Sequence, residues 1–125
     1  MDDVIRATLG QNQVIDLTTT GRRSGEPRRI EIYLHSIDGR LVITGMPSAD
    51  RTRAWLHNVD ANPAVTIHLK QGISADLAGT ARVVTDPAER RPLLERAAAN
   101  WGRTDVDVMM IHSPLIEVVI PGFPA

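Results

Sequence analysis

The sequence predicts a small antiparallel β-barrel or β-sandwich with a few short helices, on three observations. Six short segments alternate between apolar and polar residues, which is the two-residue period of strands with one buried face. Turn residues separate these segments, among them Asp38-Gly39, a dipeptide typical of tight hairpins. Only two segments carry the longer period of a helix. The chain of 125 residues has the usual length of one domain, so we expect residues 1–125 to form a single domain.

Each expected strand is placed where the alternation is clearest. The strands cover residues 14–20, 29–35, 41–46, 65–69, 77–84 and 115–120. In the second strand, three apolar residues share the face predicted to point into the core: Ile30, Ile32 and Leu34. The opposite face of that strand carries the residues with polar groups: Arg29, Glu31, Tyr33 and His35. Gly79 is expected at a bulge or at a close approach between strands.

Two helices are expected between the strands. The longer helix begins after the N-cap residue Asp86, which is followed by a proline and by Glu89 as the acid of a capping box, and it ends at Gly102. Its apolar stripe consists of Leu93, Leu94, Ala97, Ala98 and Trp101. The shorter helix is expected over residues 50–59, and it stops before Pro63.

Composition excludes several classes of function. A net charge of −1 and a pI of ≈ 6.4 argue against nucleic acid as a partner. The chain has no cysteine, so it has neither a disulfide framework nor a thiolate nucleophile. Its four histidines are scattered, are expected at the surface or at strand ends, and predict no metal site. The acidic start and the lack of a long apolar run predict a cytoplasmic protein without a stable membrane anchor.

The most distinctive segment is residues 18–29, Thr-Thr-Thr-Gly-Arg-Arg-Ser-Gly-Glu-Pro-Arg-Arg. Four arginines and one glutamate give it a local charge of +3 within eight residues. A turn that exposes guanidinium groups, the Ser24 hydroxyl and backbone N–H groups can bind phosphate or carboxylate. A solvated hairpin tip explains the same residues equally well. Tyr33 would add an aromatic surface suited to a flat ring beside an anionic tail, although cross-strand packing also explains it.

Residues 17–28 resemble the L-T-T-x-G-R-[KR]-[ST]-G-x-x-R signature of the deazaflavin-dependent nitroreductase family. The resemblance continues through Tyr33, through residues 38–43 and through the pattern W-L-x-N-x-x-x-N-P-x-V that begins at Trp55. It implies a mainly β (α+β) fold, a six-stranded antiparallel split β-barrel of the FMN-binding, pyridoxamine-phosphate-oxidase-like kind. It also implies the cofactor coenzyme F-420, a deazaflavin with a phosphodiester and an oligoglutamate tail.

Carried over by position, the implied cofactor-binding residues form three groups. The phosphate and the tail would be held by the turn residues Arg22, Arg23, Ser24 and Arg28. The deazaflavin pocket would be lined from adjacent strands by Glu31, Tyr33, Thr44 and Met46. The other side would be closed by residues on or before the short helix: Arg51, Arg53, Trp55 and Asn58. For Trp55, packing in the core is the alternative.

The reaction that the resemblance implies is hydride transfer from the reduced deazaflavin to a small electrophilic acceptor: a quinone, an enone or a nitroaromatic compound. Tyr33 is the one phenol in the chain and the expected catalytic residue, as a weak proton or hydrogen-bond donor. The segment 94–102 lacks the tyrosines that cover the acceptor in the family's nitroreductases. Trp101, Met109 and Met110 are the large side chains left for that cover.

Two other functions fit the same residues. A carrier of fatty acids or other small ligands would use the arginines to hold a carboxylate, without turnover. An FMN-dependent oxidoreductase would use them to hold the FMN phosphate. Apolar strands such as residues 115–120 permit a homodimer and do not require one.

Overall fold

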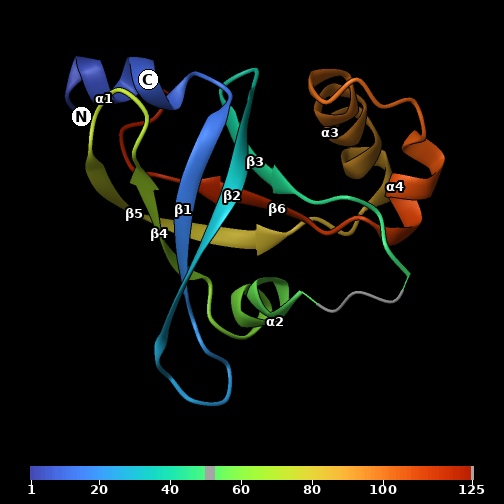
Figure 1. Cartoon of the computed structure of the whole chain (residues 1–125), viewed down its shortest axis with the longest axis horizontal. Helices are drawn as coiled ribbons and strands as arrows, with labels where there is room; N and C mark the ends of the chain where they lie inside the picture. Colours follow the sequence, from blue (N-terminus) through green and yellow to red (C-terminus); the bar gives the residue numbers. More distant parts are fainter. Residues whose placement is uncertain (50–52, 125) are drawn as a thin grey trace.

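The computed structural model describes residues 1–49 and 53–124, and within these ranges six strands close into a barrel (Figure 1). Neighbouring strands are antiparallel and follow the order β1-β2-β3-β6-β5-β4. The strands are β1 (Gln13–Thr20), β2 (Pro27–Ile37), β3 (Arg40–Thr44), β4 (Ala64–Leu69), β5 (Ala75–Val83) and β6 (Leu115–Val119). The predicted antiparallel barrel is therefore confirmed, and the sandwich alternative is wrong.

The strand pattern and the turns agree with the alternation in the sequence. Every second side chain along β1 is buried in the barrel. Asp38 and Gly39 both have positive φ, at 50° and 80°, as a two-residue hairpin turn requires. Gly79 lies at a close approach, because a Cβ added there would stand 3.0 Å from the carbonyl oxygen of Val119.

The described residues form four helices: α1 (Asp3–Leu9), α2 (Ala54–Ala61), α3 (Pro87–Asn100) and α4 (Val106–His112). In Figure 1, α1 and α2 lie at opposite ends of the barrel, whereas α3 and α4 pack beside it. The sequence did not predict α1 and α4, because seven residues are too few to reveal a helical period. The start of α2, predicted at residue 50, is at Ala54 among the residues that the structure describes.

Apolar side chains gather in two clusters among the described residues. The first fills the barrel and includes Ile15, Ile67 and Trp55. The second lies between the barrel wall and the helices α3 and α4, and it includes Val42 and Met109. Strand β3 is consequently buried on both faces, because the barrel interior covers one face and α3 with α4 covers the other.

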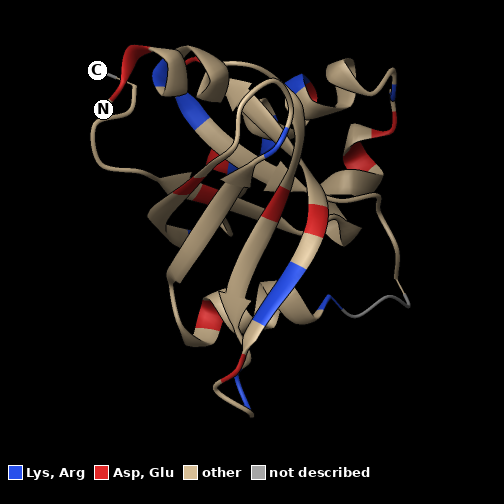
Figure 2. Ribbon diagram, turned by 60° about the vertical axis from the view of Figure 1, so that its left-hand side comes forward, with Lys and Arg blue, Asp and Glu red and all other residues tan. Residues whose placement is uncertain are grey.

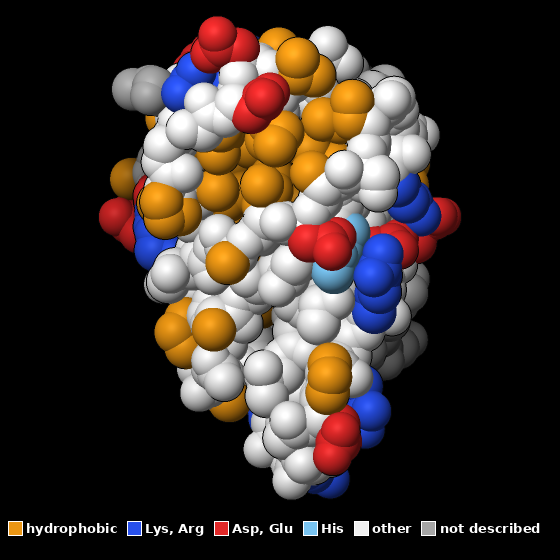
Figure 3. All heavy atoms as spheres, turned by 90° about the vertical axis from the view of Figure 1, so that its left-hand side faces the viewer, with side chains coloured by type: hydrophobic (Ala, Val, Ile, Leu, Met, Phe, Trp, Pro, Cys, Tyr) orange, Lys and Arg blue, Asp and Glu red, His pale blue; other side chains and the backbone are white. Residues whose placement is uncertain are grey.

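The surface of the barrel is partly apolar. Figure 3 shows hydrophobic side chains gathered on the upper half of the face that holds β4 and β5, with charged groups beside and below them. Half-buried residues such as Ala75 and Leu77 of β5 pack against the barrel cluster. No helix within residues 1–49 and 53–124 is long and apolar enough to cross a membrane.

The start of α3 is tied to the sheet by a network of charges. Asp86 is the N-cap, as predicted, and its carboxylate accepts from the backbone N–H of Ala88 at 3.0 Å. Glu89 does not complete the predicted capping box, because its carboxylate binds Arg40 at 2.8 Å and Arg82 at 2.9 Å instead. Glu117 of β6 joins the same two arginines. The hydrogen bonds from Arg82 and then Arg40 lower the pKa of Glu89 to about 2.

We expect Glu89→Gln to lower the free energy of unfolding at pH 7 by about 1 kcal/mol, the upper end for exposed ion pairs. Since folding lowers the pKa of Glu89 from 4.5 to about 2, its contribution is complete above pH 4.5 and is lost as the pH falls toward 2. Urea denaturation of both proteins at about pH 7 and pH 3 measures this effect. The difference between them should shrink at the lower pH, and an equal difference at both pH values would contradict the prediction.

Candidate functional site

The arginine turn, defined as residues 21–28, forms the tip of the hairpin between β1 and β2. Its ends are joined by the backbone N–H of Gly21, which donates to the carbonyl of Glu26 at 2.8 Å. Gly25 has a φ of 70°, which favours glycine at this position. A Cβ on Gly21 would stand 2.6 Å from the Ser24 hydroxyl oxygen, so the turn closes tightly around that hydroxyl. Figure 2 shows the basic residues along the hairpin at this end of the molecule.

Asn58 of α2 holds the arginine turn in place. Its Oδ1 accepts from the backbone N–H of Arg22 at 3.0 Å, and its Nδ2 donates to the Thr19 hydroxyl at 3.1 Å. The residue is only 4% exposed, so these bonds are shielded from water. Both ends of the amide are thus used within the protein, which makes Asn58 a positioning residue for the turn.

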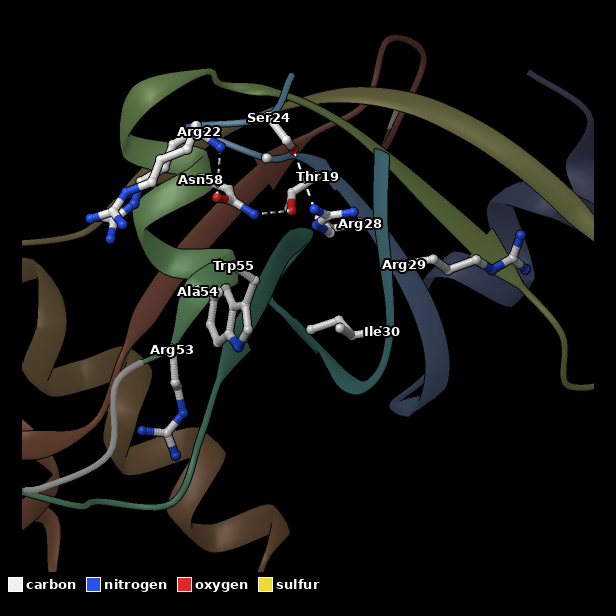
Figure 4. A pocket seen from close by; sticks show the side chains of 12 residues that line it. Thr19, Arg22, Ser24, Arg28, Arg29, Ile30, Arg53, Ala54, Trp55 and Asn58 are labelled. Atoms are coloured by element: carbon white, nitrogen blue, oxygen red, sulfur yellow. Dashed lines mark hydrogen bonds between the residues drawn. The ribbon is translucent and has the colours of Figure 1, made fainter. Parts of the chain in front are cut away.

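A pocket of ≈ 420 Å³ lies between the arginine turn, the start of β2 and the start of α2. Among the described residues, no acidic side chain lines it, whereas five arginines do: Arg22, Arg23, Arg28, Arg29 and Arg53. Figure 4 shows Arg28, Ile30 and Trp55 around one space, with Arg29 pointing to the other side of β2. Arg28 donates to the Ser24 hydroxyl at 3.3 Å, and Arg29 binds the Asp16 carboxylate at 2.9 Å.

A second pocket of ≈ 440 Å³ continues from the first and shares Ile30, Arg53 and Trp55 with it. The two pockets together are called the groove below. It opens where β2 and β3 separate, since these strands pair only over residues 35–37 and 40–42. Beyond that point β3 continues along β6, whereas β2 continues along β1. Ile30 and Ile32 pack on the barrel cluster, as predicted, and stay partly exposed because β3 does not cover them.

The structure brings the predicted site residues together. Those that line the first pocket are Arg22, Arg23, Ser24, Arg28, Arg53, Trp55 and Asn58. Those that line the second pocket alone are Glu31, Tyr33, Thr44 and Met46. Arg51 lies outside the described residues. Sequence reasoning did not place Ile30, Ile32, Gly45 and Ala54 in the site. The positions of the first three depend on the separation of β2 from β3, and that of Ala54 on where α2 packs.

Several of the predicted residues line the groove, but their polar groups are bonded to other protein groups. The Thr44 hydroxyl donates to the carbonyl of Pro114 at 2.5 Å and is buried. The Glu31 carboxylate binds the ammonium group of Lys70. Arg53 donates to the carbonyl of Met46 at 2.6 Å, which fixes its guanidinium at the boundary of the two pockets.

Two histidines differ from the prediction of a surface or strand-end position. His35 is fully buried, because Asn100 and Trp101 at the end of α3 cover it. This burial lowers the pKa of His35 to about 4, so the ring is neutral at pH 7. His68 is also buried, with Nε2 at 2.7 Å from the Thr18 hydroxyl and Nδ1 at 2.7 Å from the Asp76 carboxylate. Because His35 is buried, the predicted polar face of β2 is exposed to solvent along only part of its length.

Solved structures with the same fold support this architecture. The conserved hypothetical protein Rv2991 from Mycobacterium tuberculosis is 19% identical, with a TM-score of 0.77 over 98% of this chain and 82% of its own. A candidate pyridoxamine 5'-phosphate oxidase from Listeria innocua is 20% identical, with a TM-score of 0.67 over 97% and 94%. A structure described as F420-H2 dependent reductase (FDR-A) is 22% identical, with a TM-score of 0.66 over 85% and 93%.

The fold is a split β-barrel of the pyridoxamine-phosphate-oxidase-like kind. Residues 3–121 match the model of the F420H(2)-dependent quinone reductase family, so the chain belongs to that family. The protein is accordingly an oxidoreductase that uses coenzyme F-420, as the resemblance at residues 17–28 implied. Of the three functions that the residues left open, the deazaflavin reductase is the one confirmed.

We expect Asn58→Ala to destabilise the protein by about 1–3 kcal/mol, because the Arg22 N–H and the Thr19 hydroxyl each lose a buried partner. Urea denaturation measures the loss. Thr19→Val serves as the partial control, since it removes one of the two hydrogen bonds and should cost less. Equal stability of Asn58→Ala and the parent protein would show that the amide does not hold the turn.

Proposed function

We propose that this protein reduces a quinone or a related small electrophilic acceptor, with the coenzyme held along the groove. The observation that carries the proposal is the distribution of charge in the groove. Its first pocket is lined by five arginines and by no acid among the described residues, and its second pocket is lined by three aromatic rings. A ligand with an anionic tail and a flat ring matches this order of environments.

The residues present fit both parts of coenzyme F-420. A phosphodiester and a chain of carboxylates need charged donors, and the arginine turn offers the guanidinium groups of Arg23 and Arg28 beside the Ser24 hydroxyl. A deazaflavin ring needs apolar and aromatic surface, and Trp55 and Tyr33 supply it. The pockets measure ≈ 420 and ≈ 440 Å³, each within the range of about 300–1,000 Å³ that ligand sites occupy.

When bound in its reduced form, the coenzyme supplies a hydride to the acceptor. The chain's own residues orient the acceptor and stabilise the negative charge that develops on its oxygen. Tyr33 is the residue that we propose for this role, because its ring lines the second pocket and no described residue bonds to its hydroxyl. Trp55 and Trp101 exclude water from the same pocket. Quinones, enones and nitroaromatic compounds all develop charge on an oxygen, so the same donor serves each.

The arginine turn is tested by the double variant Arg23→Ala/Arg28→Ala. We expect it to weaken binding of oxidised coenzyme F-420 by about 3–6 kcal/mol, at roughly 1.5–3 kcal/mol for each charged hydrogen bond removed. A fluorescence titration, with FMN titrated in parallel, measures the dissociation constants. Arg29→Ala is the matched control on the same hairpin, because its guanidinium is already paired with the Asp16 carboxylate and points away from Arg28 and Trp55 in Figure 4. Unchanged affinity in the double variant would refute the assignment of the turn.

The role of Tyr33 is tested by Tyr33→Phe, which keeps the ring and removes the hydroxyl. We expect kcat with a quinone such as menadione to fall by about 100-fold, the low end for the loss of one donor to a developing oxyanion. The dissociation constant of the coenzyme should stay within about twofold, because the arginine turn is unchanged. Steady-state oxidation of the reduced coenzyme measures kcat. An undiminished kcat would remove Tyr33 from the reaction.

A further inference from the structure

Three aromatic rings meet at the end of the groove that lies away from the arginine turn. The His35 ring stands between the other two, with its centroid 4.8 Å from that of Tyr33 and 4.8 Å from that of Trp101. Both contacts are edge-to-face, at interplanar angles of 63° and 66°. Tyr33 and Trp101 both line the second pocket, and their centroids are 6.1 Å apart. His35 lies behind them and is fully buried.

The His35 ring is attached both to the barrel and to α3. Its backbone pairs with Val42 of β3, and this is the last pair before β2 leaves β3 and the groove opens. Asn100, the last residue of α3, places its Nδ2 at 3.0 Å from His35 Nδ1. The amide N–H therefore donates to Nδ1, and the ring proton is on Nε2. One hydrogen bond and two ring contacts thus hold the imidazole in one orientation.

We infer that His35, locked by Asn100, is a positioning residue that sets the angle between Tyr33 and Trp101, and so the shape of the acceptor's place in the groove. This inference rests on the proposed function. The two rings are tilted by 59° to each other, so they form a corner rather than two parallel walls. A flat acceptor can stack on one ring and present its edge to the other. This corner therefore favours a planar acceptor over a puckered one.

An aliphatic side chain at position 35 would not hold Tyr33 and Trp101 at this angle. It would fill the space but would offer no flat face or edge to the neighbouring rings and no acceptor for Asn100. The ring stays neutral at pH 7, because burial holds its pKa near 4. An uncharged imidazole can remain between two aromatic rings without the cost of a buried, unpaired charge.

The test uses Asn100→Ala, which removes the hydrogen bond from an exposed residue, and His35→Phe, which keeps a ring and loses its Nδ1. Glu95→Ala, an exposed position on the same helix, is the control. Each variant is assayed for kcat/KM with planar menadione and with the smaller enone cyclohexenone, and for coenzyme binding by fluorescence. We expect the ratio of kcat/KM with menadione to kcat/KM with cyclohexenone to fall about tenfold in both test variants. Coenzyme affinity should stay within about twofold, because the arginine turn is unchanged.

Trp101 fluorescence provides a readout that does not depend on turnover. In a Trp55→Phe background Trp101 is the sole tryptophan, and Asn100→Ala should increase its quenching by acrylamide. Increased quenching together with the altered acceptor ratio supports the inference. An unchanged ratio overturns it, and so does an equal loss on both acceptors with weaker coenzyme binding, which would indicate general damage. Failure of the parent protein to bind coenzyme F-420 would instead refute the proposed function.

Discussion

The groove exists because β2 and β3 pair over only three residues and then separate. β2 has eleven residues and β3 has five, and beyond residue 42 β3 pairs with β6 alone, along its other edge. Residues 27–34 of β2 are left with β1 as their strand neighbour, and the wall of the barrel opens beside them. Trp55 from α2 reaches this opening and lines both pockets. The opening is therefore lined in turn by the ring of Trp55, by the edge of β2 that β3 leaves unpaired, and by the arginine turn.

Charge is distributed so that only some of the arginines are available to a ligand. Arg29 is paired with Asp16, and Lys70 binds both Asp16 and Glu31 on the outer face of the barrel. These ion pairs neutralise the charged groups on this face, whereas Arg28 meets only the Ser24 hydroxyl among the described residues. A chain of net charge −1 can in this way present a strongly cationic pocket. This local charge, and not the overall charge, governs affinity for a polyanionic cofactor.

The helices α3 and α4 cover the outer face of β3, so that this face is buried. Arg90 of α3 donates to the carbonyls of Val84 at 2.8 Å and Ser113 at 3.0 Å, which ties α3 to the segment that precedes it and to the residue that follows α4. Burial lowers the pKa of Arg90, but its bonds to carbonyl oxygens satisfy the guanidinium. With α3 held in this way, Trp101 at its end covers His35 and reaches the groove.

The sequence by itself determined the antiparallel β-fold, the hairpin turns and the arginine turn, because these depend on local period and on residues such as Gly25 and Gly39 that accept positive φ. The period left a barrel and a sandwich open, and the resemblance at residues 17–28 indicated the barrel. The resemblance also indicated eleven of the described residues that line the groove. Only the tertiary structure decided that His35 is buried, that the Asn58 amide binds within the protein, and that Glu89 joins arginines from two strands. Each of these facts depends on which elements meet in space, and a local pattern carries no record of contacts between residues far apart in the chain.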